Sequence, residues 1–351
     1  MLLHGQSVVF TQNTWLINLK SQSEIELDET AEPLLGVRRS VLGQAWQERG
    51  HIPRIAEAIS SKLDIPLASA ALIASRGVSI DDAPSFLEPR LQDLMPDPSV
   101  VKDMDRATDR IIDAIIAGEK IAIFGDYDVD GATSSSLFIH YLKAVGADVS
   151  AYIPDRLKEG YGPNKAALLG LHAAGVSLVI TVDCGTLSYE PLQAASDAGL
   201  DVIVVDHHKA ETVLPAAIAI VNPNRLDDTS EDLGQLAAVG VSFLVLVSVN
   251  RALKDKNFFD VDRVAPNLLQ WLDLVALGTV CDVVPLTGLN RALVRQGLKV
   301  MATRQNVGLT ALADVGRLNE APTPYHLGFV MGPRVNAGGR VGEAGLGTKL
   351  L

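Results

Sequence analysis

The sequence predicts an α/β protein built on a parallel sheet, with a helical segment in front of it. Short apolar runs rich in β-branched residues alternate with stretches of helical periodicity after residue 119. Strands separated by helices at this spacing indicate βαβ units, and such units form a parallel sheet. At 48% hydrophobic and 21% charged residues, the 351-residue chain has the composition of a folded globular protein, long enough for about two domains.

The segments differ in pattern along the chain. Residues 1–52 form an N-terminal extension that is partly irregular. Residues 53–118 form a helical preface interrupted by prolines, in which Ile55–Leu63 has apolar positions spaced three and four apart. Residues 119–290 carry the pattern of the sheet domain, and residues 291–351 follow it.

Within residues 119–290 the strand pattern repeats. The first run, Lys120–Phe124, ends in Gly125, and a turn of small residues leads to a helix over Thr133–Val145 that Gly146 closes. Further strands are predicted at 148–153, 176–182 and 200–205. Further helices are predicted at 164–174, 188–198, 235–254 and 266–278.

Charge and cysteine content exclude several classes of protein. Lys and Arg number 30 and Asp and Glu 42, and the net charge of −12 argues against a basic surface for nucleic acid or anionic lipid. Cys184 and Cys281 are the only cysteines, which excludes a disulfide framework and favours a reducing compartment. The longest apolar run, Val239–Val249, is shorter than the roughly 20 residues that span a bilayer, and no signal peptide is visible. We expect a cytoplasmic location.

Acidic residues and histidines stand where the predicted strands end, and ligands of open parallel sheets bind at this edge. These residues are Asp126, Asp128 and Asp130 after the first strand, Asp183 after the third, Asp206, His207 and His208 after the fourth, and Asp282 after a helix. Carboxylates packed this densely repel one another unless cations hold them together. Oxygen ligands with an imidazole suit Mn²⁺ or Mg²⁺, and two such ions favour in-line displacement at phosphorus.

Each motif also has a simpler interpretation. A single Asp at a strand end, such as Asp126 or Asp130, is commonly a helix N-cap. The Asp-x-Asp-x-Asp-Gly run matches part of a calcium loop, but Gly131 follows the third Asp directly and no Glu stands at the required spacing. A His-His pair alone is weak evidence for a metal site. The combination at successive strand ends is what favours a metal centre.

The same segments resemble the successive motifs of the DHH phosphoesterase family. The matching motifs are Gly125-Asp-Tyr-Asp-Val-Asp-Gly131, Asp183-Cys-Gly185, Asp206-His-His208 and Gly278-Thr-Val-Cys-Asp282. Other segments resemble the branch of single-strand-specific exonucleases within that family, namely Ile153–Gly162, Gly332–Arg340, and Ala74–Gly77 with Phe86–Pro89. The resemblance covers roughly residues 33 to 351 and makes residues 119–290 a DHH phosphoesterase domain.

The resemblance implies a role for each motif residue. The implied metal ligands are Asp128, Asp130, Asp183, His207 and Asp282. Asp183 is the expected bridge between two Mn²⁺ or Mg²⁺ ions and, with His208, the expected catalytic residue. The family often has a His at the position of Phe124, so Asp126 is the candidate replacement ligand. His208 is expected to touch the scissile phosphate or protonate the leaving group, and Asp206 to orient a histidine as a hydrogen-bond acceptor.

Substrate contacts are expected from the two segments that resemble the exonuclease branch. The candidate residues are Arg156, Tyr161, Asn336 and Arg340. Arginine is suited to bidentate contacts with phosphate, and tyrosine to stacking on a base of a single strand. A surface ion pair is the alternative for each arginine, and core packing is the alternative for Tyr161.

The resemblance implies a 5′ to 3′ exonuclease that releases 5′-mononucleotides from single-stranded DNA by two-metal hydrolysis, in DNA repair and recombination. It also implies a single-strand-binding protein and a helicase as partners. Two alternatives stay open: a DHH phosphodiesterase on short oligonucleotides or cyclic dinucleotides, and a non-catalytic scaffold. Because members of this branch continue further, we expect residues 291–351 to be a helical linker and the start of a second lobe. The chain is then an N-terminal fragment with weak or no activity by itself.

Overall fold

The computed structural model describes residues 37–43, 53–156, 158–230, 232–341 and 343–351. These residues form two compact units, divided after Pro84. In the first unit, α1 (Pro53–Leu63) packs against α2 (Leu67–Ala74), and the face of α1 that carries Ala56 and Ile59 is buried. The spacing of these two residues, three apart, is that of the predicted amphipathic helix.

The second unit is built on a five-stranded sheet in which every pairing is parallel, in the order β2-β1-β3-β4-β5. The strands are β1 (Ile121–Gly125), β2 (Val149–Tyr152), β3 (Leu178–Val182), β4 (Asp201–Val205) and β5 (Ala219–Val221). The α/β fold class with a parallel sheet is confirmed. The sequence analysis did not predict β5, a strand of three residues that ends the apolar run 216–221.

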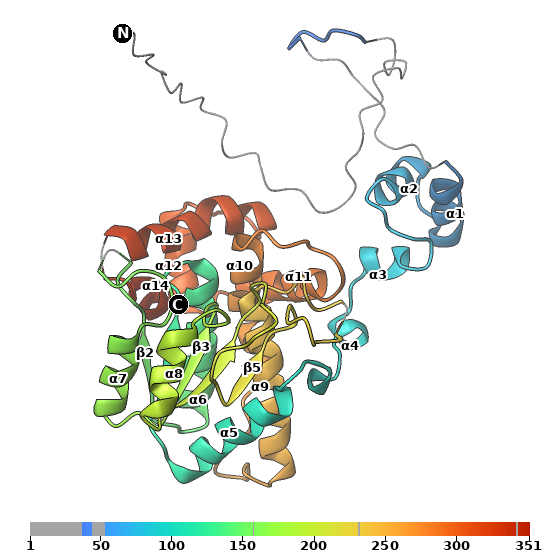
Figure 1. Ribbon diagram of the computed structural model, residues 1–351. Coiled ribbons are helices and arrows are strands. Elements are labelled where there is room, and N and C mark those ends of the chain that lie inside the picture. Colours follow the sequence, from blue (N-terminus) through green and yellow to red (C-terminus); the bar gives the residue numbers. More distant parts are fainter. Residues whose placement is uncertain (1–36, 44–52, 157, 231, 342) are drawn as a thin grey trace, which may run out of the picture. The chain divides into compact units, whose positions relative to one another are not determined.

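Helices connect the strands and cover both faces of the sheet (Figure 1). Before the sheet lie α3 (Ala83–Leu87), α4 (Leu91–Leu94), the 3-10 turn η2 (Pro98–Val100) and α5 (Met104–Ala117). Around the sheet lie α6 (Val129–Ala144), α7 (Lys165–Ala173), α8 (Tyr189–Asp197), α9 (Ala238–Asp255), the 3-10 turn η3 (Leu268–Trp271) and α10 (Leu272–Cys281). These positions agree with the predicted helices to within a few residues, except that the helix predicted at 266–278 is divided into a 3-10 turn and α10.

Alternate residues of β1 pack into two apolar layers, one on each face of the sheet. Ile121 and Ile123 belong to the layer made with α5, α6, α9 and α10, and Ala122 and Phe124 belong to the layer made with α7 and α8. A strand buried on both faces is mostly apolar, and β1 and β3 are so except for Thr181 of β3.

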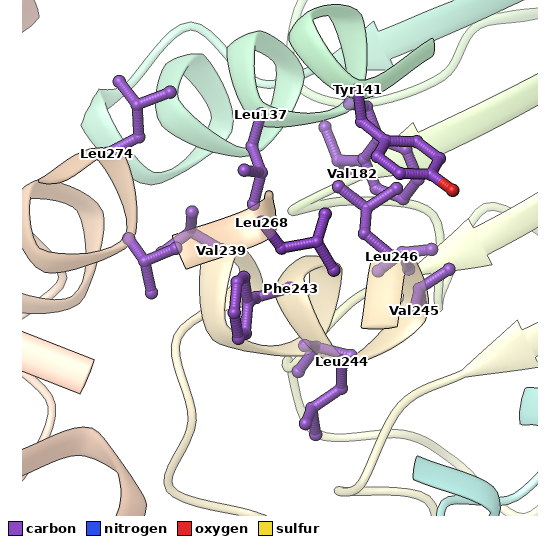
Figure 2. Packing of buried hydrophobic residues seen from close by; sticks show 14 of the residues in the cluster. Leu137, Tyr141, Val182, Val239, Phe243, Leu244, Val245, Leu246, Leu268 and Leu274 are labelled. Atoms are coloured by element: carbon purple, nitrogen blue, oxygen red, sulfur yellow. The ribbon is translucent and has the colours of Figure 1, made fainter. Parts of the chain in front are cut away.

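The layer with α9 is the larger of the two, and Figure 2 shows part of it. Leu137 and Tyr141 of α6, Phe243 of α9 and Leu268 of η3 are buried there beside Val182 of β3. Burial of a side chain of this size contributes about 1.5–3 kcal/mol, so this layer holds the sheet edge that carries the acidic residues in place.

Residues after α10 are mainly helical. They form α11 (Gly288–Ala302), α12 (Val307–Val315), the π-helix η4 (His326–Met331), α13 (Gly332–Val341) and α14 (Leu346–Leu350). α11 lies directly on α10, since a β-carbon at Gly297 would lie 2.5 Å from the β-carbon of Ala276. None of the described helices is long and apolar enough to cross a membrane.

Candidate metal centre

The strand order places the acidic residues at a switch point of the sheet. The chain winds in opposite directions on the two sides of the β1–β3 pair, and a crevice opens at the carboxyl ends of the strands at such a point. Asp126 follows β1 directly and Asp183 follows β3 directly. Together with Asp128 they form a group whose ligand atoms lie within 4.8 Å of one another. Two neighbouring strands therefore deliver three carboxylates to one place.

The turn from β1 into α6 fixes the first motif. Asp128 is the N-cap of α6, and one of its carboxylate oxygens accepts a hydrogen bond from the Gly131 amide at 3.0 Å. The helix therefore begins earlier than the predicted start at Thr133, and Asp130 lies in its first turn. A β-carbon at position 131 would lie 2.5 Å from the carbonyl oxygen of Asp126, so this approach requires glycine.

Asp130 caps a second helix. Its Oδ2 accepts a hydrogen bond from the Ala238 amide at 2.6 Å, and its Oδ1 accepts one from the Val239 amide at 2.9 Å. These amides belong to the first turn of α9, which has no carbonyl partners for them within the helix. The simpler interpretation of Asp130 as the N-cap of the helix after its own strand is wrong, because Asp128 is the N-cap of α6 and Asp130 binds the first amides of α9 instead. Each carboxylate oxygen still has a lone pair for a further contact.

Asp183 is held in an uncommon backbone conformation. Its φ is 60°, in the left-handed region that few residues other than glycine adopt. The Thr181 hydroxyl donates to the Cys184 carbonyl at 3.0 Å, and a β-carbon at Gly185 would lie 2.6 Å from that hydroxyl. The Tyr161 hydroxyl donates to the Asp183 carbonyl at 3.1 Å. These contacts keep Asp183 in its strained backbone conformation, and such strained residues are concentrated at functional sites.

Asp206, which is 1% exposed, organises the turn after β4. Its Oδ1 accepts hydrogen bonds from the amides of His207 at 2.8 Å and His208 at 3.2 Å, and from Nδ1 of His208 at 2.7 Å. Its Oδ2 accepts one from the Thr186 amide at 3.1 Å. Burial acts to raise the pKa of Asp206, but the hydrogen bond and charge of His208 outweigh it and hold the pKa below its ordinary value. The same bond raises the pKa of His208, so His208 is the histidine that Asp206 orients.

His207 is oriented by backbone instead. Its Nδ1 lies 3.0 Å from the Leu236 carbonyl oxygen, which can only accept, so Nδ1 donates and Nε2 keeps its lone pair. Burial lowers the pKa of His207, and the charge of His208 lowers it further. A neutral imidazole with one nitrogen donating to a carbonyl is the form that binds a metal ion through the other nitrogen.

The imidazole of His207 lies within the acidic cluster. Its Nε2 is 3.3 Å from Oδ1 of Asp183 and 3.9 Å from Oδ2 of Asp130, and its Nδ1 is 3.6 Å from Oδ2 of Asp282. Besides the group of Asp126, Asp128 and Asp183, two more groups have ligand atoms within 4.8 Å of one another: Asp183 with His207 and His208, and Asp130 with His207 and Asp282. Asp183 and His207 are each shared by two groups, which suits two neighbouring cations with a shared carboxylate.

The carboxyl groups of this cluster resist ionisation. Burial, followed by the charge of Asp128, raises the pKa of both Asp126 and Asp282 to about 7. Burial also raises the pKa values of Asp130 and Asp183 well above the ordinary value, and neighbouring carboxylates add to the effect. A cation placed among them would reverse this effect, because positive charge favours the ionised form.

Three buried polar atoms of the cluster have no hydrogen-bond partner: Oδ1 of Asp126, Nε2 of His207 and Oδ2 of Asp282. Among the described residues, no Lys or Arg forms an ion pair with Asp126 or Asp282. Buried polar atoms in folded proteins almost always have a partner. Carboxylate oxygens together with an imidazole nitrogen are donors that Mn²⁺ and Mg²⁺ accept, so the residues present fit such ions.

Two predicted substrate contacts lie on the loop between β2 and α7. The guanidinium carbon of Arg156, an exposed residue, lies 4.9 Å from the centroid of the Tyr127 ring. Tyr161 is 57% exposed, and its ring meets that of His208 edge-on with the centroids 6.3 Å apart. The core-packing alternative for Tyr161 is therefore wrong.

The other two predicted contacts lie on α13. A β-carbon at Gly339 would lie 2.8 Å from the Tyr127 carbonyl oxygen, so α13 passes close to the first motif. Oδ1 of Asn336 is buried and has no hydrogen-bond partner. The side chain of Arg340 lies outside the described part of the structure.

Sequence reasoning missed the residues that support the two histidines. Nδ2 of Asn224 donates to the His207 carbonyl at 2.6 Å, and Nδ2 of Asn222 donates to the His208 carbonyl at 2.8 Å. Both residues follow β5 at the same sheet edge, so the rule that found the acidic residues would have found them if β5 had been recognised.

The fold and the site together define a class: an α/β domain that gathers carboxylates and imidazoles at the carboxyl edge of a parallel sheet, where divalent cations fit. Residues 120–279 match the model of the DHH family, N-terminal domain. The chain therefore carries a DHH-family domain, as its motifs predicted.

Curated relatives share this sequence beyond the DHH domain. The single-stranded-DNA-specific exonuclease RecJ of Salmonella typhimurium is 38% identical over 292 residues, which cover 82% of this chain and 50% of that protein. RecJ of Bacillus subtilis is 38% identical over 301 residues, which cover 84% of this chain and 36% of that protein. The chain thus spans about half the length of the first relative and less of the second.

Solved structures of RecJ have the same fold. Exonuclease RecJ bound to manganese matches with a TM-score of 0.63 and 34% identity, over 74% of this chain and 62% of that one. RecJ of Thermus thermophilus in complex with Mn²⁺ matches with a TM-score of 0.69 and 30% identity, over 85% of this chain and 41% of that one. The resemblance to the RecJ branch of the DHH family is confirmed.

Proposed function

We propose that this chain provides the metal-dependent catalytic edge of a 5′ to 3′ exonuclease that releases 5′-mononucleotides from single-stranded DNA. The observation that carries the proposal is the buried cluster at the switch point, in which Nε2 of His207 and oxygens of Asp126 and Asp282 have no partner. The similarity to RecJ proteins supports the choice of substrate and reaction.

The metal ligands in this proposal are Asp126, Asp128, Asp130, Asp183, His207 and Asp282. Asp183 would be the carboxylate that both ions share, a role supported by its membership in two of the three groups of ligand atoms. When bound, two Mn²⁺ or Mg²⁺ ions supply Lewis-acid stabilisation of the charge that develops on the phosphate. The left-handed backbone of Asp183 holds its carboxylate in place before substrate binds.

His208 moves the proton in this proposal. Its Nδ1–H is committed to Asp206, so Nε2 is the atom that contacts the scissile phosphate or protonates the leaving oxygen. Asp206 raises the pKa of His208 and so favours the protonated imidazole that this role requires. The side chain of His208 is 49% exposed, which leaves it accessible to a substrate.

Arg156, Tyr161, Asn336 and Arg340 are the proposed substrate contacts. The ring of Tyr161 is exposed while its hydroxyl is fixed to the Asp183 carbonyl, an arrangement suited to stacking of a base beside the cluster. Arg156 and Arg340 supply positive charge for the phosphate backbone, and the amide of Asn336, a partly buried residue, supplies hydrogen bonds.

The proposal extends to the organisation of the whole protein. Residues 1–52 are an extension, 53–118 a helical preface, 119–290 the DHH domain, and 291–351 a helical linker and the start of a second lobe. By family resemblance, the protein acts in DNA repair and recombination in the cytoplasm, with a single-strand-binding protein and a helicase as partners.

Labelled single strands test the proposal. The full-length protein is incubated with Mn²⁺ and strands labelled at the 5′ or the 3′ end, and early products are resolved by length. We expect the 5′ label to appear first, as a mononucleotide. Early release of the 3′ label would show that digestion runs in the 3′ to 5′ direction, opposite to the proposed one. Cleavage of only short oligonucleotides or cyclic dinucleotides would favour the general DHH phosphodiesterase, and no cleavage at all would favour the scaffold.

A further inference from the structure

The loop between β2 and α7 brings two proposed substrate contacts to the metal centre. Arg156 lies over the ring of Tyr127, which belongs to the first acidic motif, and the Tyr161 hydroxyl donates to the Asp183 carbonyl at 3.1 Å. Both side chains therefore depend on the course of this loop. The loop contains Gly160 and Gly162, with φ of 84° and 73°. Because glycine is conformationally permissive, other contacts must hold the loop in a single conformation.

Glu159 supplies these contacts from inside the loop. Its Oε2 accepts hydrogen bonds from the Tyr152 hydroxyl at 2.6 Å and from Nδ2 of Asn164 at 3.2 Å, and its Oε1 accepts one from the Asp155 amide at 2.8 Å. The three donors come from the last residue of β2, the start of the loop and the N-cap of α7. One carboxylate thus joins both ends of the loop.

The chemistry of this contact requires a carboxylate. All three partners are donors, and an ionised carboxylate accepts from several donors more strongly than a neutral group does. Burial acts to raise the pKa of Glu159, yet the hydrogen bonds from Tyr152, Asp155 and Asn164 hold it below its ordinary value. Burial and Glu159 together raise the pKa of Tyr152 to about 12, so the tyrosine stays a donor.

We propose that Glu159 is a positioning residue, whose carboxylate fixes the loop so that Arg156 and Tyr161 meet the incoming strand at the metal centre. The inference rests on the proposed function and adds a residue that touches neither metal nor substrate. Its effect is on strand binding, because Glu159 acts through the two side chains that contact the strand. The ligands of the metal centre lie outside its hydrogen bonds.

Asn164→Asp is the most selective test. Aspartate is as good an N-cap as asparagine, so it keeps the hydrogen bond that the Ala167 amide donates to residue 164 at 2.9 Å. It also replaces the Nδ2 donor with an acceptor that repels Glu159. In the full-length protein with Mn²⁺ and a single-stranded oligonucleotide, we expect KM to rise about tenfold while kcat changes less than about twofold.

A double variant combines Asn164→Asp with Glu159→Gln, so that residue 159 becomes the donor and residue 164 the acceptor of the hydrogen bond between them. The Gln amide donates to the new carboxylate at position 164, its oxygen accepts from the Asp155 amide, and the Tyr152 hydroxyl can rotate to accept. We expect the double variant Glu159→Gln, Asn164→Asp to recover most of the lost KM, which a merely structural defect would not do. Glu88→Gln, an exposed glutamate outside the loop, is the matched control and is expected to leave KM unchanged.

Calorimetry with Mn²⁺ alone and anisotropy with a labelled strand separate the possible failures. We expect unchanged metal affinity in every variant and weaker strand binding in Asn164→Asp. An unchanged KM and strand affinity in Asn164→Asp would overturn the role of Glu159 while leaving the proposed function intact. A wild-type protein that binds Mn²⁺ but neither binds nor cleaves a single strand would overturn the proposed function, and this inference with it.

Discussion

The acidic residues at the two edges of the sheet have different partners. At the amino edge, Glu119 precedes β1 and Asp201 begins β4, and Arg110 joins them: its Nε is 2.6 Å from Asp201 and an Nη is 2.6 Å from Glu119. At the carboxyl edge of the same two strands, Asp126 follows β1 and Asp206 follows β4, and the described residues provide no Lys or Arg ion pair for either.

The comparison shows that a high density of acidic residues does not by itself indicate function. At the amino edge the protein supplies the opposite charge, so the cluster is complete and fastens α5 to the sheet. At the carboxyl edge it supplies imidazoles and leaves buried oxygens without partners. A cluster that lacks its own counter-charge is the one built to receive a cation.

The largest expected effect comes from removing one charge at the carboxyl edge. Asp183→Asn keeps the side-chain shape and tolerates the left-handed backbone, so we expect the fold to survive. Turnover of single-stranded DNA by the full-length protein should fall roughly a thousandfold, or about 4 kcal/mol of transition-state stabilisation. Asp201→Asn at the amino edge is the matched control and should keep near-normal turnover. Near-normal turnover by Asp183→Asn would remove the basis of the two-metal assignment.

The two histidines should fail in different ways. His207→Ala should weaken Mn²⁺ binding at least about tenfold, measured by calorimetry, because Nε2 is the unpartnered nitrogen. His208→Ala should spare Mn²⁺ binding and lower kcat roughly a hundredfold, since general acid catalysis contributes that much. His172→Ala on α7 serves as the control for both. Equal loss of Mn²⁺ affinity in the first two variants would mean that both histidines are ligands.

Substitutions at the amino edge should lower the free energy of unfolding and leave kcat unchanged. Arg110→Ala leaves two carboxylates without their partner, and we expect the free energy of unfolding in urea to fall by about 2 kcal/mol, with normal kcat below the unfolding transition. Arg106→Ala on the same helix removes an exposed pair with Asp103 at 3.5 Å and should cost less than about 1 kcal/mol. A loss of turnover in folded Arg110→Ala would contradict the division between the two edges.

The last expected effect is a pH dependence of the metal-free protein. The pKa of Asp126 and of Asp282 rises from 3.8 to about 7 on folding, so the folded state binds protons more tightly and stability falls as pH rises between these values. Asp130 and Asp183 act in the same direction, and His207, whose pKa is lowered, opposes them. Thermal unfolding in EDTA should show the decline, and Mn²⁺ should reverse it near pH 7. A Tm in EDTA that rises steadily with pH over this interval would argue that groups of the protein itself neutralise the carboxylates of the cluster.

Much of the site could be predicted because of a geometric rule that needs no tertiary detail. Parallel strands end at one edge, so Asp126, Asp183 and Asp206 had to approach one another once their strands were recognised. The carbonyl of Leu236 could not be found in this way, because it lies in a loop that follows no strand. The same holds for the hydrogen bond between Tyr161 and Asp183, since loop paths depend on contacts distant in sequence.

The sequence by itself determined which residues lie at the carboxyl edge of the sheet and the family to which their motifs belong. It did so because strand periodicity and motif order are local properties of the chain. Only the tertiary structure decided how each residue is used: Asp130 caps α9, Asp206 orients His208 rather than His207, and a backbone carbonyl orients His207. The bonds of Asp130 and His207 depend on packing, because their partners Ala238 and Leu236 lie far away in the sequence and no local pattern points to them. Packing also decides which of two neighbouring histidines Asp206 binds, because the Leu236 carbonyl already holds His207.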